Sequence, residues 1–198
     1  METQALVIIG TIVHLFGSMA YVRDTYLGRS QPNRVSFFLW AFAPFIGVAA
    51  ALAQGVTWAV FPVFLAGFGP CMIFMASFHN KNAAWKLGKF DWVCGALSLA
   101  ALVLWAITKN PNIAILFAIL SDGAAALPTI KKSWTHPESE TIWVYLGASF
   151  SSSTGLYLAK DMSFAEIAFP SYLIMLCGLI ASLILIGKWR NARRIRVA

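Results

Sequence analysis

Two ionisable side chains, His14 and Asp122, lie deep inside apolar stretches of membrane-spanning length. An ionised carboxylate at the centre of a bilayer costs about 2.5 to 3.5 kcal/mol on insertion scales, so it usually faces a cavity or a partner. We therefore expect Asp122 to contact a solute or to carry a proton. The alternative is a protonated carboxyl that hydrogen-bonds a neighbouring helix. For His14, a solute or proton contact competes with an ordinary interhelical hydrogen bond.

A run of small and hydroxyl-bearing residues extends from Gly147 to Gly155. Ser149 and Ser152 lie on one face of the expected helix, where their hydroxyls can form the wall of a solute pathway. Small residues also let helices approach closely, so tight helix packing is the alternative interpretation.

Two aromatic residues and two prolines are candidates for moving parts. Trp40 and Tyr145 each lie about one turn inside a helix, which suggests a paired gate or, alternatively, interfacial anchors. Pro44 and Pro128 each free a backbone carbonyl inside a helix, so they are candidate hinges or simple packing kinks.

The composition decides the class of protein. Hydrophobic residues make up 59% of the 198 residues and charged residues only 12%, with a mean hydropathy of +0.71. Soluble domains contain about a quarter charged residues, and disordered chains contain more. The sequence therefore predicts an all-α polytopic membrane protein, and the net charge of +7 is better explained by topology than by nucleic-acid binding.

Seven apolar windows are long enough to cross a hydrocarbon core of about 30 Å. They are 4–22, 35–53, 58–78, 92–108, 112–130, 141–159 and 165–187. With the N-terminus outside and the C-terminus inside, 13 of the 15 Lys and Arg lie on the inner side, leaving only Lys109 and Lys160 outside. This asymmetry is the positive-inside pattern, and it favours the N-out, C-in orientation.

The first and last three windows superimpose at a shift of 105 residues. The shift places Pro32 on Pro137, Ser36 on Thr141, and Trp40 on Tyr145. It also places Asp122 on Gly17, which shares a helical face with His14, so we expect His14 and Asp122 to face each other across a pseudo-twofold axis. The predicted divisions are a first repeat (1–79), a linker region with the fourth helix (80–111), a second repeat (112–187) and a basic cytoplasmic tail (188–198).

The segment Ala126-Leu127-Pro128-Thr129-Ile130-Lys131-Lys132-Ser133-Trp134 is similar to a PQ motif and its Lys/Ser-rich continuation, with Thr129 in the place of glutamine. Ser139-Glu140-Thr141 opens the next helix. Together with the arrangement of three, one and three helices, these features resemble the SWEET and PQ-loop transporter superfamily. The resemblance implies two parallel three-helix repeats with a solute site between them.

We therefore expect an integral carrier of a small polar solute in the plasma (inner) membrane that works by alternating access, with proton coupling left open. A non-transporting sensor or assembly partner is the alternative, and a membrane-embedded enzyme is third. Enzyme activity, metals and cofactors are not expected, because the spans hold one His and one Asp and the cysteines are far apart. The expected partners are membrane lipids and a small-molecule solute. Nucleic acid is not expected, and a homo-oligomer is left open.

Overall fold

The computed structural model describes residues 2–53, 61–79, 85–108, 110–159 and 163–197. Within these ranges the chain is helical and contains no strand. The elements are α1 (Glu2–Tyr26), α2 (Arg34–Ala53), α3 (Phe61–Ala76), α4 (Lys89–Ile107), α5 (Pro111–Thr135), the short 3₁₀ helix η3 (Pro137–Ser139), α6 (Trp143–Tyr157) and α7 (Phe164–Val197). The predicted all-α class is confirmed, while Trp58, the expected start of the third window, lies outside the described residues.

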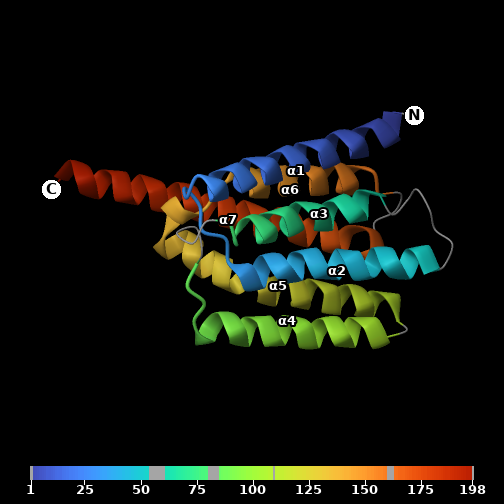
Figure 1. Cartoon of the computed structure of the whole chain (residues 1–198). Helices are drawn as coiled ribbons and strands as arrows, with labels where there is room; N and C mark the ends of the chain where they lie inside the picture. The colour runs from blue at the N-terminus through green and yellow to red at the C-terminus, as the bar shows by residue number, and fades with distance from the viewer. Residues whose placement is uncertain (1, 54–60, 80–84, 109, 160–162, 198) are drawn as a thin grey trace.

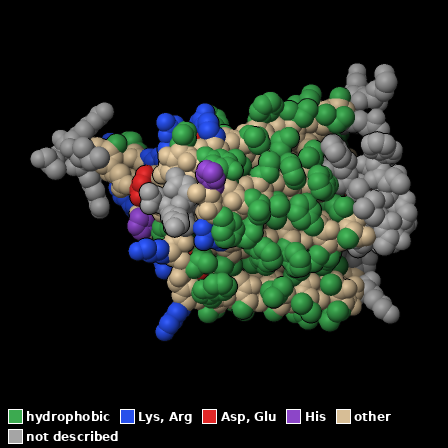
Figure 2. Space-filling view, in the orientation of Figure 1, with side chains coloured by type: hydrophobic (Ala, Val, Ile, Leu, Met, Phe, Trp, Pro, Cys, Tyr) green, Lys and Arg blue, Asp and Glu red, His purple; other side chains and the backbone are tan. Residues whose placement is uncertain are grey.

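Four of these helices are long and apolar enough to cross a membrane. The qualifying segments are Ala5–Tyr26, Lys89–Ile107, Asn112–Thr135 and Glu166–Arg193, and shorter apolar segments occur at Arg34–Ile46 and Val63–Ala76. Large apolar side chains are exposed over much of the surface, for example Phe16 at 71% and Met175 at 75%. Figure 2 shows hydrophobic side chains covering most of the face in view between the charged end and the grey residues. The chain is therefore a membrane-embedded helical protein.

Helix starts are fixed by side chains that bind free backbone amides. Asn33 Oδ1 accepts hydrogen bonds from Val35 N at 3.1 Å and Ser36 N at 3.2 Å at the start of α2. Asp91 Oδ2 accepts from Gly88 N at 2.6 Å at the start of α4. Asn33 Nδ2 also donates to Asp91 Oδ1 at 2.5 Å, which joins the two helix starts. The same two side chains therefore begin α2 and α4 and hold them together.

The helices form two groups with the same internal packing. We call α1, α2 and α3 the first triplet, and α5, α6 and α7 the second triplet. In the first, α3 packs against both α1 and α2; in the second, α7 packs against both α5 and α6 (Figure 1). Between the triplets, α1 packs against α6 and α2 against α5, while α4 lies against α5 and α2.

Positive charge gathers where α1 ends, α2 and α4 begin and α5 ends; we call this the basic end (Figure 2). Lys81, Lys109 and Lys160 lie outside the described residues. The predicted division at residue 188 is not a helix boundary, because α7 continues to Val197. Arg190 stabilises this extension: its Nη2 donates to Trp134 O at 2.7 Å, and its guanidinium lies 4.4 Å from the centre of the Trp134 ring.

Candidate functional site

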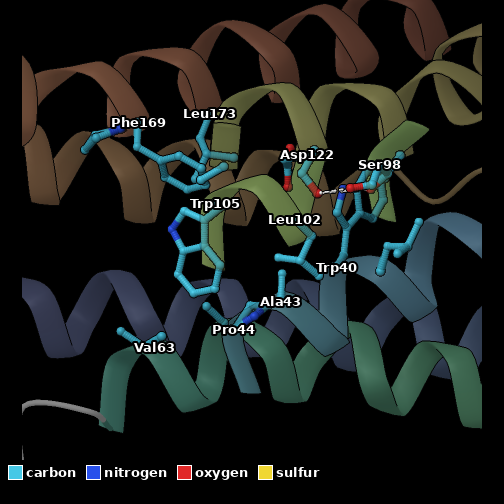
Figure 3. Close-up of a pocket in the computed structure, with 16 residues that line it drawn as sticks. Trp40, Ala43, Pro44, Val63, Ser98, Leu102, Trp105, Asp122, Phe169 and Leu173 are labelled. Atoms are coloured by element: carbon cyan, nitrogen blue, oxygen red, sulfur yellow. Dashed lines mark hydrogen bonds between the residues drawn. The ribbon is translucent and has the colours of Figure 1, made fainter. Parts of the chain in front are cut away.

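Two adjoining cavities, which we call the central cavities, lie in the middle of the helices. The larger has a volume of about 530 Å³ and is lined by α2, α3, α4, α5 and α7 (Figure 3). The smaller has a volume of about 150 Å³ and is lined by α1, α2, α3, α5, α6 and α7. Asp122, Trp40, Pro44 and Phe169 line both. Most of the remaining lining is aliphatic or aromatic.

The smaller cavity brings together several residues singled out from the sequence. These are His14, Trp40, Pro44, Asp122 and Tyr145. Pro128 lies elsewhere, in a cavity of about 450 Å³ at the basic end whose lining includes Lys86, Lys89 and Lys131. Ser149 and Ser152 line neither central cavity. Five of the eight candidates thus share one space, drawn from both triplets and distant in sequence.

Asp122 is held by one tyrosine that sequence reasoning missed. Tyr172 of α7 donates its hydroxyl proton to Asp122 Oδ2 at 2.8 Å. A Cβ at Gly123 would lie 3.3 Å from the Tyr172 hydroxyl oxygen, so glycine beside Asp122 leaves room for this approach. The sequence offers only a weak signal for Tyr172, a phenol inside an apolar helix. Ser121, the residue before Asp122, donates its hydroxyl to Ser98 O at 2.9 Å.

His14 and Asp122 share the smaller cavity without direct contact. Among the described residues, no hydrogen bond and no ion pair within 4.0 Å joins their side chains. Both side chains line this cavity, His14 from α1 and Asp122 from α5. Direct exchange of a proton between them would require a bridging group or a movement of the helices.

The small residues of α6 form a close contact with α1. A Cβ added to Gly147 would lie 2.9 Å from His14 Cα, and one added to Gly10 would lie 2.6 Å from Thr154 Oγ1. Ser153 Oγ donates to Ser149 O at 2.9 Å within the helix. Tight packing, the alternative interpretation of this run, therefore accounts for Gly147.

A buried polar cluster lies at the basic end, and the sequence did not reveal it. We call Lys132, Glu140, Tyr21, Tyr145 and the carbonyl of Gln31 the basic-end cluster. Lys132 Nζ lies 2.6 Å from Glu140 Oε1, and both side chains are 0% exposed. The hydroxyls of Tyr21 and Tyr145 each donate to Glu140 Oε2 at 2.9 Å. Lys132 also donates to Gln31 O.

Further hydrogen bonds join the two triplets around this cluster. Gln31 N donates to Ser139 O at 2.9 Å, and Thr141 Oγ1 donates to Asp24 Oδ2 at 2.9 Å. Ser36 Oγ donates to Ala125 O at 2.6 Å. The basic end is thus a polar junction between the triplets.

The expected gate residues are both next to this junction, but they play different parts. Tyr145 is buried and belongs to the basic-end cluster. Trp40 packs edge-on against Phe37 at 5.3 Å, and Phe37 packs against Tyr21 at 5.1 Å. The Trp40 Nε1 atom is buried without a hydrogen-bond partner. Trp40, Phe37 and Tyr21 therefore connect the central cavities to the basic-end cluster.

No group of three or more His, Cys, Asp or Glu side chains suitable for a metal occurs among the residues placed by the structure. The cysteines Cys71, Cys94 and Cys177 are free. Comparison with protein-family models, curated proteins and solved structures found no match to the chain.

Proposed function

We propose that the chain is a carrier that moves a small polar solute across a membrane by alternating access. The observation that supports this best is the pairing of a central cavity with a polar junction that closes one end of it. A carrier requires a solute site in the middle of its helices and a barrier that can open on each side in turn. In this conformation the basic end is the closed side.

On this proposal all seven helices span the membrane, with the N-terminus outside and the basic end in the cytoplasm of the plasma (inner) membrane. The gathering of Lys and Arg at one end supports the orientation, since cytoplasmic loops are enriched in these residues (Figure 2). The length of α7 also agrees with a C-terminal end that extends out of the membrane at the basic end. Its 34 residues make a helix about 51 Å long, well beyond a core of about 30 Å.

The packing of the triplets supports a carrier of the SWEET and PQ-loop type. In each triplet the third helix lies against the first and second, and each first helix meets the second helix of the other triplet. This is the arrangement that two parallel repeats about an axis along the membrane normal would adopt.

Opening the basic end would require a small set of contacts to break. The contacts from Tyr21 to Glu140 and from Lys132 to Gln31 O join the two triplets, and they must separate if the triplets rock apart. Pro44 and Pro128 lie inside continuous helices that border this region, where each removes one backbone hydrogen bond. On the proposal they are the points at which α2 and α5 bend.

The native Cys177 offers a direct test, because it lines the smaller central cavity and is 6% exposed. Cys71→Ser and Cys94→Ala leave it as the single cysteine. A membrane-impermeant methanethiosulfonate is applied to vesicles with the basic end outward. Glu140→Gln, which removes the ion pair but keeps an acceptor for both tyrosines, should raise the labelling rate at least about tenfold, a shift of about 1.4 kcal/mol.

Glu138→Gln is the matched control, since Glu138 is an exposed carboxyl beside the same junction. It should leave labelling unchanged. Labelling from the opposite side should fall in Glu140→Gln, because one cavity cannot be open to both sides. The non-transporting alternative predicts access to Cys177 from one side only in every variant, and that result would refute the proposal.

A further inference from the structure

The described residues that line the central cavities include one carboxyl and no Lys or Arg to compensate it. Asp122 is the only Asp, Glu, Lys or Arg among the described residues that line them. His14 lines the smaller cavity but makes no ion pair with Asp122 within 4.0 Å. Tyr172 supplies one hydrogen bond, to Oδ2, which leaves the second carboxyl oxygen available. Beyond that one hydrogen bond, a carboxyl in such surroundings avoids the cost of a buried unpaired charge either by staying protonated or by pairing with a cation that enters the cavity.

The other polar groups of the larger cavity are mostly occupied. The hydroxyls of Ser98 and Ser121 lie 3.1 Å apart, and Ser121 also donates to Ser98 O. Figure 3 shows Asp122 near Ser98, with aliphatic and aromatic side chains around the rest of the space. A polyol in this cavity would bury several hydroxyls without partners, each at a cost of about 1 to 3 kcal/mol.

Aromatic rings border the same space as Asp122. Trp40 from α2, Trp105 from α4 and Phe169 from α7 surround the larger cavity (Figure 3). Aromatic faces attract organic cations, and a carboxylate accepts the N–H groups of an ammonium. A volume of about 530 Å³ lies within the usual range for small-molecule sites, about 300 to 1,000 Å³.

We propose that the larger cavity binds an organic ammonium ion with an apolar body, whose N–H groups bond Asp122 and whose body lies against Trp40, Trp105 and Phe169. This inference rests on the proposed function, because it names the class of solute carried. It narrows the class of solute from any small polar molecule to an amine with an apolar body. It also excludes anions, which Asp122 repels, and sugars, which the apolar walls leave unpaired.

The test compares ligands that differ only in charge. Isothermal titration of the purified full chain in detergent uses 2-phenylethylamine, which is cationic at neutral pH, and its neutral analogue 2-phenylethanol. The amine should bind at least about tenfold more tightly than the alcohol. 3-Phenylpropanoate and glucose should give no binding. Equal affinity for the amine and the alcohol would overturn the inference without any variant of the protein.

A second arm locates the charge that is recognised. Asp122→Asn should reduce the affinity for the amine at least about tenfold, to that of the alcohol, while Glu138→Gln binds like the parent. Unchanged amine affinity in a folded Asp122→Asn protein would refute the assignment. Amine binding with no flux through proteoliposomes would reject the carrier function and keep the amine site. Flux of another solute with no amine binding would reject the amine site and keep the carrier function.

Discussion

Replacing Lys132 by methionine should lower the free energy of unfolding by about 3 kcal/mol, because it leaves the buried carboxylate of Glu140 without its cation. Glu140 would still accept two tyrosine hydroxyls, which limits the loss. Glu140→Leu should cost more, about 5 kcal/mol, since it leaves the ammonium with the Gln31 carbonyl and the Trp85 ring but no anion, and it leaves both tyrosine hydroxyls unpaired.

The double variant Lys132→Met/Glu140→Leu should cost about 2 kcal/mol, which is less than Glu140→Leu alone and far below the sum of about 8, because it buries no unpaired charge and only the two tyrosine hydroxyls lose their acceptor. Reversible unfolding in mixed micelles, followed by circular dichroism as sodium dodecyl sulfate is added, measures all three values. Arg23→Gln is the control: its pair with Asp24 is at the surface, with the Arg23 side chain 67% exposed, so it should cost less than about 1 kcal/mol. Strictly additive costs, or single variants below about 1 kcal/mol, would contradict a buried and coupled pair.

The remaining predictions use simpler readouts. Tyr172→Phe removes the hydroxyl that donates to Asp122 and should destabilise the protein by about 1 kcal/mol in the same unfolding assay; an unchanged midpoint would mean that the bond contributes nothing. Gly147→Ala forces a methyl group against the α1 backbone and should cost about 1 to 3 kcal/mol, whereas Gly155→Ala, with no atom within 4 Å, should be neutral or stabilising. In a cysteine-free protein, a cysteine at the exposed Arg29 should react only with permeant reagents in intact cells, and one at the exposed Asn112 with impermeant ones; the opposite pattern would reverse the orientation.

The helices were predictable because each apolar window overlaps one helix of the structure. The window 35–53 corresponds to α2 at 34–53, and 112–130 falls within α5. The largest difference is at the end of α7: the predicted window ends at residue 187, just before the first cation, Lys188, whereas the helix continues to Val197. Arg and Lys are good helix formers, and Arg190 of α7 donates a hydrogen bond to the Trp134 carbonyl of α5. The helix therefore continues beyond the end of its apolar segment.

The buried ion pair was not predictable from the same rules. The sequence places Lys132 among the cations that set topology, and it places Glu140 at the start of the sixth span. Nothing in their spacing shows that η3 folds between them or that Tyr21, more than a hundred positions away, donates to the same carboxylate. Asp122 was found because an acid inside an apolar window is conspicuous, but its partner Tyr172 is hidden among many aromatics of the spans.

The location of the polar groups bears on how a carrier could switch. The basic-end cluster holds an ion pair, two tyrosines and several interhelical bonds, whereas the central cavities retain one carboxyl with an oxygen to spare. On the proposed mechanism the cluster gains water when it opens, so hydration of Lys132 and Glu140 offsets much of the lost attraction. A barrier made of apolar side chains would lose the free energy of their burial when it opened, and hydration would not offset that loss. The closed and open states of a buried charged junction can therefore have nearly equal free energies. A carrier requires this balance, because the binding of one solute must be enough to shift the equilibrium between the two states.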